Sequence, residues 1–198
     1  MDIMLGIVDK VIPQENFITI VGIFFVYSIL GWLVESFYMS ICNRKLTNRG
    51  FIKGPICPIY GMGEFLVYAL LAPFAGNYIV LFFTGMFIAT TLELFTAKIM
   101  IKKLGFVWWD YTNKPFNYKG ILCLESTIGW GIYTIVEFAF LRNAVVKMIS
   151  MTPRRLLIVG IVVLSTYYMF AFALSLRRIA VGEIEVCENN LRAVNDNK

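Results

Sequence analysis

Residues 78–100 read YIVLFFTGMFIATTLELFTAKIM, a long apolar run with a glutamate, Glu93, inside it. A run of about 20 apolar residues is long enough for a helix to cross the roughly 30 Å hydrocarbon core of a bilayer. An ionised carboxylate at that depth costs about 2.5 kcal/mol or more, so it usually faces a polar interior and a partner. This stretch therefore predicts a membrane helix with a candidate functional residue.

The composition of the whole chain agrees with a membrane protein. Of its 198 residues, 59% are hydrophobic and 16% are charged, and the mean hydropathy is +0.72. Soluble domains are usually about 45–50% apolar and about 25% charged. We expect an all-α polytopic bundle of about five transmembrane helices, at residues 18–38, 58–73, 78–100, 120–141 and 156–176. The transmembrane domain then covers residues 14–178, between an N-terminal amphipathic segment (1–13) and a cytoplasmic tail (179–198).

Basic residues predict the orientation in the membrane. They gather in the loops after the first and third expected spans: Arg44, Lys45, Arg49 and Lys53, then Lys102, Lys103, Lys114 and Lys119. Because cytoplasmic loops are enriched in Lys and Arg, we expect a multi-pass protein of the cell membrane with its N-terminus outside and its C-terminus in the cytoplasm. The same rule accounts for the net charge of +5 without nucleic acid, and the expected surroundings are membrane lipids.

One basic segment disagrees with this topology, since Arg142, Lys147, Arg154 and Arg155 would lie outside. Either this segment is an interfacial amphipathic helix, or the fourth span re-enters the membrane and the span count is wrong.

The two basic loops resemble each other in sequence. Residues 48–57 read NRGFIKGPIC and residues 113–123 read NKPFNYKGILC, which align with one inserted residue. Each block follows an expected helix with a glutamate and opens the next span. The pattern predicts a duplicated hairpin, 18–75 and 78–141, related by a pseudo-twofold axis along the membrane normal, as in some transporters. The alternative is that basic, glycine-containing loops are alike by composition alone.

Acidic residues form the candidate site. Glu35, Glu93 and Glu125 lie just beneath the basic loops, with Glu35 about 12 Å before the first loop at 1.5 Å rise per residue. This arrangement predicts an acidic cavity, open to the cytoplasm, in which the acids bind a proton, a cation or a cationic group and the loop bases bind an anion. The candidate binding residues are Glu35, Glu93, Glu125, Arg49, Lys53, Asn48, Asn117, Tyr60, Asp110 and Glu64. Glu137, near the outer end of the fourth span, is expected to be a snorkelling surface charge.

Two irregular stretches border these acids. Residues 54–63, GPICPIYGMG, combine prolines and glycines that oppose a regular helix entry. Such backbone either lines a cavity within the protein or lies in water above the headgroups, and both readings stay open. Residues 108–111, WWDY, suit the membrane–water interface, and we expect Asp110 to pair with Arg49 or Lys53.

Residues and motifs that several common kinds of catalytic and metal sites require are missing from the sequence. The chain has no histidine and no CxxC spacing, so no metal or other cofactor is expected. The cysteines, which all map to the cytoplasmic side, are expected to be reduced thiols that act as small hydrophobes: Cys42, Cys57, Cys123 and Cys187. No Walker A, G-x-S-x-G or helix-opening G-x-G-x-x-G sequence is present. A non-enzyme is therefore favoured, although catalysis by the acids, Tyr60, Tyr111 or a cysteine stays open.

Specific blocks resemble a known family. The blocks are residues 31–35 (GWLVE), residues 48–51 (NRGF) with 54–61 (GPICPIYG), and WWDY followed by Phe116, Asn117 and Gly120. They resemble the bacterial membrane proteins catalogued as "putative ABC-transporter type IV", or CmpB-like. The resemblance covers roughly residues 30–130. It implies a permease, and because the chain has no nucleotide-binding domain it also implies a separate ATPase subunit.

Three functions remain open. The first is a small transporter or permease subunit, coupled to protons or cations and completed by a second copy or a partner membrane subunit, because five spans are slender for alternating access. The second is a membrane-embedded enzyme that acts on a lipid headgroup or an isoprenoid phosphate and requires a divalent metal. The third is a non-transporting scaffold or sensor, in which the acids merely neutralise buried Lys and Arg.

Overall fold

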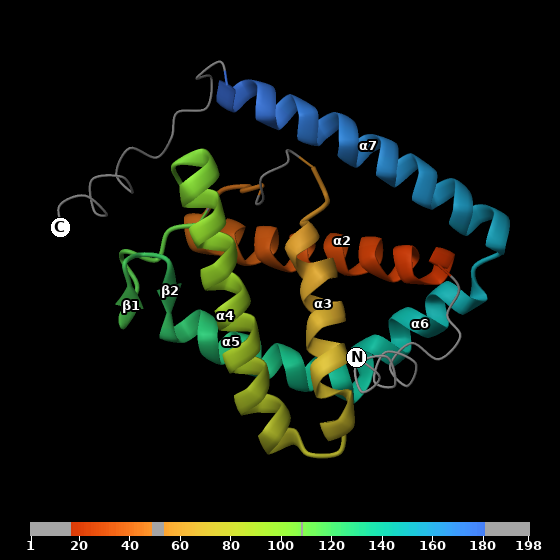
Figure 1. Ribbon diagram of the computed structural model, residues 1–198, viewed down its shortest axis with the longest axis horizontal. Coiled ribbons are helices and arrows are strands. Elements are labelled where there is room, and N and C mark those ends of the chain that lie inside the picture. Colours follow the sequence, from red (N-terminus) through yellow and green to blue (C-terminus); the bar gives the residue numbers. More distant parts are fainter. Residues whose placement is uncertain (1–16, 49–53, 108, 181–198) are drawn as a thin grey trace. The chain divides into compact units, whose positions relative to one another are not determined.

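The computed structural model describes residues 17–48, 54–107 and 109–180, without the side chains of residues 42, 43, 179 and 180. This part of the chain is all-α apart from one pair of two-residue strands (Figure 1). The elements are α2 (Phe17–Asn43), α3 (Pro58–Leu71), a 3-10 turn (Ala72–Phe74), α4 (Tyr78–Leu104), β1 (Asn117–Tyr118), β2 (Leu122–Cys123), α5 (Leu124–Val136), a π turn (Glu137–Leu141), α6 (Arg142–Met151) and α7 (Arg154–Ala180).

The chain divides into two compact units. Unit 1 comprises Met1–Pro73 and Glu137–Ser175, and so holds α2, α3, the π turn, α6 and most of α7. Unit 2 comprises Phe74–Val136 and Leu176–Lys198, and so holds α4, the strand pair and α5. The expected N-terminal segment and most of the expected tail lie outside the described residues.

Three of the described helices are long and apolar enough to cross a membrane: Phe17–Ile41, Tyr78–Leu104 and Arg154–Arg178. They coincide with the first, third and fifth expected spans. Helix α3 has 14 residues, which rise about 21 Å and fall short of the roughly 30 Å hydrocarbon core. The all-α membrane fold is therefore confirmed, while the count of five crossings and the duplicated hairpin stay predictions.

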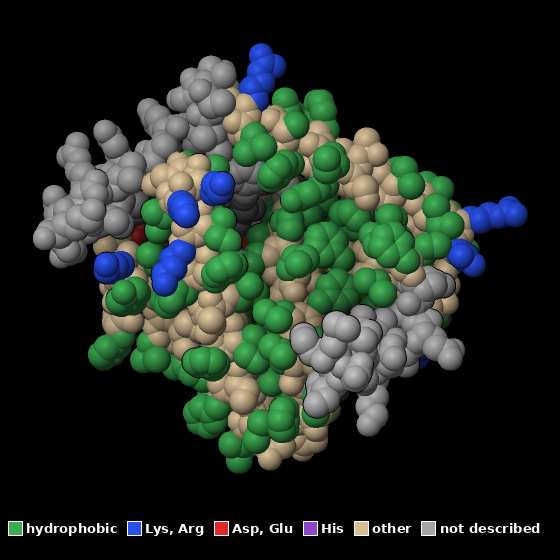
Figure 2. All heavy atoms as spheres, viewed as in Figure 1, with side chains coloured by type: hydrophobic (Ala, Val, Ile, Leu, Met, Phe, Trp, Pro, Cys, Tyr) green, Lys and Arg blue, Asp and Glu red, His purple; other side chains and the backbone are tan. Residues whose placement is uncertain are grey.

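Exposed hydrophobic side chains follow the long helices, where lipid would cover them (Figure 2). On α4 they include Phe83, Phe87 and Phe95. On α7 the apolar window has no residue buried against the rest of the protein. This is the surface expected of membrane helices, because lipid tails solvate apolar side chains as well as a protein core does.

The ends of α4 follow from its sequence. Asn77 caps the helix, because its side-chain oxygen accepts a hydrogen bond of 3.1 Å from the Val80 amide. Gly105 ends it in the left-handed region, at φ 85°, which glycine adopts without steric cost. Lys102 and Lys103 occupy the last turn, where the helix dipole favours positive charge.

In unit 1, α2 and α3 approach closely at Gly61. A Cβ atom there would lie 2.6 Å from the Phe24 carbonyl oxygen and 2.6 Å from the Ser28 hydroxyl oxygen. Small residues at such positions let membrane helices pack backbone to backbone. The core beside this contact consists of Ile23 and Tyr27 from α2 and Val145 and Ile149 from α6, with Leu157 of α7 against it.

In unit 2, α4 and α5 pack through their own glycines. Gly85 of α4 lies directly against the Thr134 side chain, and a Cβ atom on Gly131 of α5 would lie 2.7 Å from Phe82 and Met86. The loop before α5 forms the antiparallel pair β1–β2, in which Asn117 lies opposite Cys123.

The segment that contradicted the positive-inside pattern is helical. α6 continues directly from the π turn, and its buried face presents Arg142, Val145 and Ile149, while Lys147 is exposed. The spacing is that of an amphipathic helix. Arg142 therefore belongs to the interior of unit 1 and does not count as a loop charge.

Candidate functional site

Glu93 lies at the centre of unit 2. Its side chain is only 6% exposed, on the face of α4 that also buries Gly85 and Ala97. Its carboxylate accepts hydrogen bonds from the Trp130 indole N–H at 3.0 Å, the Tyr111 hydroxyl at 3.2 Å and the Ser126 hydroxyl at 3.4 Å. These three donors come from α5 and from the loop before it, and together they fix the position of the carboxylate.

Helix geometry explains two of these donors. Ser126 and Trp130 are four residues apart on α5, so they share one helix face and reach the same carboxylate oxygen. Thr90 of α4 and Thr127 of α5, whose hydroxyl oxygens are 3.3 Å apart, add a polar contact to the same helix pair. The wall of the site is therefore built from the α4–α5 hairpin.

The loop between α4 and α5 supplies the third donor. The Tyr111 amide donates to the Gly120 carbonyl at 2.9 Å, and the Trp109 indole donates to the Ile121 carbonyl at 2.8 Å. Gly120 has φ 66°, a conformation that favours glycine. The loop is thus closed on itself and carries Tyr111 to Glu93.

Two of the expected binding residues brace this loop. The Asn117 side chain donates to the Thr112 carbonyl at 3.1 Å and the Lys114 carbonyl at 2.9 Å, and accepts from the Gly120 amide at 3.1 Å. Asp110 accepts from the Thr112 amide at 2.9 Å and from the Thr112 hydroxyl. Both side chains make bonds that fix the backbone, which the sequence pattern did not predict.

Glu125, the other expected acid of this hairpin, lies in a different environment from Glu93. Its side chain is 51% exposed and accepts a hydrogen bond of 2.8 Å from the Lys114 ammonium group. Such exposed ion pairs usually stabilise a protein by less than about 1 kcal/mol. Of the two expected acids of this hairpin, Glu93 is therefore the one in a buried polar site.

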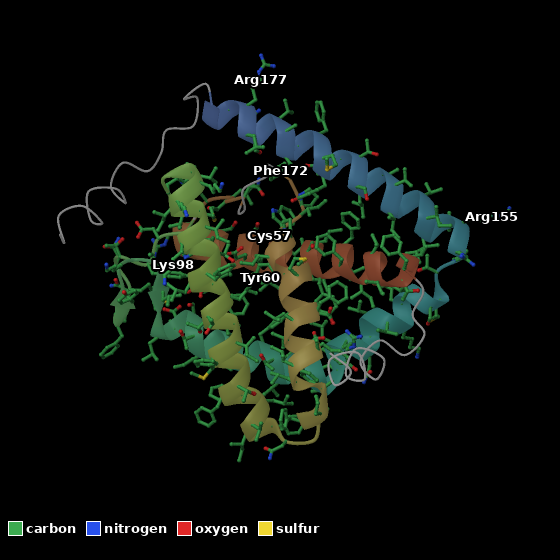
Figure 3. All side chains as sticks on the ribbon, viewed as in Figure 1. Cys57, Tyr60, Lys98, Arg155, Phe172 and Arg177 are labelled. Carbon is green, nitrogen blue, oxygen red and sulfur yellow. The ribbon has the colours of Figure 1, made fainter. Side chains whose placement is uncertain are left out.

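In unit 1, Tyr60 lies in the first turn of α3, as labelled in Figure 3. The Tyr60 ring lies directly against Gly31 of α2, one helical turn before the half-buried Glu35. Asn48 accepts a hydrogen bond of 2.6 Å from the Trp32 indole N–H. Arg49 and Lys53 lie outside the described residues, so their expected pairing with Asp110 stays a prediction.

Cysteine side chains mark the starts of two helices. Cys57, labelled in Figure 3, immediately precedes α3, and its amide donates to the Ser28 carbonyl at 2.9 Å. Cys123 immediately precedes α5. Both side chains are buried, whereas the Cys42 side chain and Cys187 are not described. In the part of the chain that the structure covers, no three His, Cys, Asp or Glu side chains come close enough to hold a metal ion.

Unit 1 contains a second buried polar cluster, around Arg142. The Arg142 guanidinium donates to the Glu64 carboxylate, and its central carbon lies 3.4 Å from the centre of the Tyr68 ring. Tyr68 in turn stacks on Phe138, with ring centroids 5.5 Å apart. Glu64 is therefore buried as expected, but its partner comes from a segment that the charge pattern placed in a loop.

The expectation for Glu137 was wrong. Its side chain is 1% exposed, and both carboxyl oxygens lie 2.8 Å from the Tyr27 hydroxyl. Glu137 and Arg142 are five residues apart, which in an α-helix separates them by about 140° around the axis. The π turn Glu137–Leu141 has i→i+5 hydrogen bonds, which place both residues toward the interior of unit 1.

Comparisons with curated proteins and with solved structures give no match. A family model described as "Putative ABC-transporter type IV" matches residues 22–176. The match extends beyond the blocks that carried the resemblance in sequence and includes most of α7.

Proposed function

The chain belongs to the family described as "Putative ABC-transporter type IV", and on that basis we propose that it is a small transport subunit of the cell membrane. In this proposal Glu93 binds the positive charge, a proton or a cationic group, that moves with the substrate. Glu35 and Tyr60 form the corresponding place in the first hairpin, and Arg49 and Lys53 meet an anionic group at the mouth.

The observation that carries the proposal is the environment of Glu93. A carboxylate buried between apolar helices requires compensation for its lost hydration. Tyr111, Ser126 and Trp130 give it hydrogen bonds from neutral groups. These bonds hold the carboxyl group in one position inside the helix pair, where it can receive the positive charge of a proton or of a cationic group.

A duplicated hairpin is part of the proposal. Cys57 and Cys123, which correspond in the sequence alignment, each immediately precede the second helix of a hairpin. Each hairpin also uses a glycine at its helix–helix contact, Gly61 in one and Gly131 in the other. These parallels support a repeat in which Glu35 and Glu93 have equivalent roles, beneath basic loops that face the cytoplasm.

The proposal includes an energy source and partner subunits. Because no Walker A sequence is present, ATP-driven transport requires a separate ATPase subunit. We propose in addition that a second copy or a partner membrane subunit completes the pathway. Proton or cation coupling through Glu93 is the alternative source of energy.

A thermal-shift screen of the purified full chain tests the proposal. Cationic metabolites, amino acids, metal ions and lipid headgroups would be compared on wild type, Glu93→Gln and Glu125→Gln. The last variant is a matched control, since it makes the same change at an exposed acid of the same hairpin. At 100 times its Kd, a ligand stabilises the folded state by about 2.7 kcal/mol, a shift of several degrees.

The proposal predicts a ligand that raises the Tm of wild type and of Glu125→Gln but not of Glu93→Gln. An equal shift in all three proteins would contradict a role of Glu93 in binding. Stabilisation that requires a divalent metal together with a lipid phosphate would favour the membrane-embedded enzyme instead.

One observation favours a second function, the non-transporting scaffold or sensor. Glu64 pairs with Arg142 in the interior of unit 1, so at least one of the membrane acids neutralises a base. A scaffold would show no ligand response in the screen, and Glu93→Gln would then lower the Tm without any ligand.

A further inference from the structure

Three ionisable side chains are buried together in unit 1. Glu64 of α3 is 3% exposed, Glu137 of the π turn is 1% exposed and Arg142 of α6 is 8% exposed. Two carboxyl groups thus share the interior with one guanidinium. If both were ionised, the cluster would hold one negative charge in excess.

The guanidinium is engaged by Glu64 and Tyr68. Arg142 donates to the Glu64 carboxylate and lies over the face of the Tyr68 ring, 3.4 Å from its centre. An aromatic face attracts a cation, and a carboxylate pairs with it directly. The charge of Arg142 is therefore balanced by Glu64, with Phe138 stacked behind the Tyr68 ring.

Glu137 has a different hydrogen-bond partner, the phenol of Tyr27. The phenol oxygen lies 2.8 Å from each of the two carboxyl oxygens. An ionised carboxylate only accepts hydrogen bonds, so both contacts would have to share the single phenol hydrogen. A protonated carboxyl group donates one bond and accepts the other, so that each contact has its own hydrogen.

We propose that Glu137 is the proton-binding residue of a buried site in unit 1, with Tyr27 as the hydrogen-bond partner of its acid form. Proton loss would leave a buried anion within electrostatic reach of Arg142, which would then be shared between Glu64 and Glu137. The groups that act on Glu137 are Tyr27 on α2 and Arg142 on α6, and Arg142 in turn contacts Glu64 and Tyr68 on α3.

The π turn makes this arrangement possible. It brings two residues five positions apart, Glu137 and Arg142, to the same side of a continuous helical segment. π turns are uncommon and occur frequently at functional sites. In a transporter the Glu137 proton would be a coupling ion distinct from the ligand at Glu93. That role rests on the proposed function, but the protonation does not.

Infrared spectroscopy of the purified full chain at neutral pH, without any ligand, tests the site. The carbonyl band of a protonated carboxyl group would be compared in wild type, Glu137→Gln, Tyr27→Phe and Glu125→Gln. We expect wild type to show a band from a protonated carboxyl group, Glu137→Gln to lose that contribution, Tyr27→Phe to shift it, and the exposed control Glu125→Gln to keep it unchanged.

Two results would overturn the proposal: no such band in wild type, or a band of undiminished intensity in Glu137→Gln. If Glu137→Gln does not fold, the comparison of wild type with Tyr27→Phe tests the proposal instead. A shift of the band in Tyr27→Phe would support Glu137 as its source, whereas an unshifted band would belong to another acid and would overturn the proposal. Since no substrate is present, and a proton held by Glu93 would contribute equally to wild type and to Glu137→Gln, the difference between these two proteins does not depend on the role of Glu93.

Discussion

Single acidic residues of this chain lie in three kinds of environment. Glu93 is buried among neutral donors, Glu64 is buried against a guanidinium, and Glu125 is exposed beside Lys114. The three carboxylates have the same intrinsic chemistry, so their different surroundings determine what each can do. Substituting glutamine, which keeps the shape and removes the charge, should therefore have a different effect at each position.

Glu64→Gln should strongly destabilise the protein. The substitution leaves the guanidinium of Arg142 buried without its counter-charge, and breaking a buried ion pair in this way costs about 3–5 kcal/mol. Unfolding of the detergent-solubilised protein, followed by circular dichroism, measures the loss. The double variant Glu64→Leu with Arg142→Met removes both charges and should be clearly more stable than Glu64→Gln. A Glu64→Gln variant as stable as wild type would show that the pair is not needed.

The environment of Glu137 illustrates what residue patterns do not reveal. Regular α-helical spacing places positions 137 and 142 on different sides of a helix, and both lie near the end of an expected span. A snorkelling Glu137 and a loop-borne Arg142 were expected because of their place at the outer end of that span. The π turn changes the number of residues per helical turn locally, and the residue types in Glu137–Leu141 do not predict it. Burial of Glu93 and Glu64, by contrast, was predictable from their apolar neighbours.

At the level of elements, glycines determine how closely the helices of each hairpin approach. Gly61 brings α3 against the backbone of α2, and Gly131 brings α5 against α4. Between α4 and α5, the braced loop carries Tyr111 to Glu93. The hairpins and their loops thus build the site, and changes at these contacts should act on it through the positions of whole helices.

Gly61→Ala should destabilise unit 1, because the new Cβ atom would lie 2.6 Å from the Phe24 carbonyl oxygen, which the helix backbone holds in place. Overpacking of this kind costs about 1–3 kcal/mol. The matched control is Gly129→Ala on α5, where a Cβ atom meets nothing within 4 Å and helix propensity should improve stability by up to about 1 kcal/mol. Thermal unfolding of both variants measures the difference, and equal Tm values would contradict the close packing at Gly61.

The positions of the helices could be predicted from the sequence, whereas the shape of the loop could not. Apolar runs located α2, α4 and α7, and the cap residue Asn77 and the terminal Gly105 agree with the ends of α4. Asn117 and Asp110 hydrogen-bond to the loop backbone, and these bonds depend on the path of that backbone. The path includes φ 53° at Phe116 and at Lys119, and neither residue type indicates such a conformation in the sequence. Their bracing of the loop could therefore not be predicted from the sequence, and their expected part in binding stays a prediction.

At the level of the whole molecule, each of the two units has a polar cluster in its interior. Unit 2 holds the Glu93 site, and unit 1 holds the cluster of Glu64, Glu137 and Arg142. The family match over residues 22–176 includes both. The direction in which each loop faces decides whether a ligand reaches Glu93 from the cytoplasm.

Cysteine labelling should locate the two ends of α4. In a background with the native cysteines replaced, Gly76→Cys and Lys103→Cys place single thiols at exposed positions before and near the end of this helix. The positive-inside rule predicts that a membrane-impermeant maleimide labels Gly76→Cys in intact cells and Lys103→Cys only after permeabilisation. The reverse pattern would place the basic loop, and the mouth of the Glu93 site, outside.

The most direct test of the central claim is the Tm of Glu93→Gln without ligand and with the compound that stabilises wild type. A glutamine can keep the contacts of Glu93, since its carbonyl oxygen can face Trp130 and Ser126 while the Tyr111 hydroxyl accepts from its amide. If Glu93 serves to bind a ligand, the variant should melt within a few degrees of wild type and lose the ligand shift. A variant that unfolds without ligand, or one that keeps the full shift, would contradict the claim.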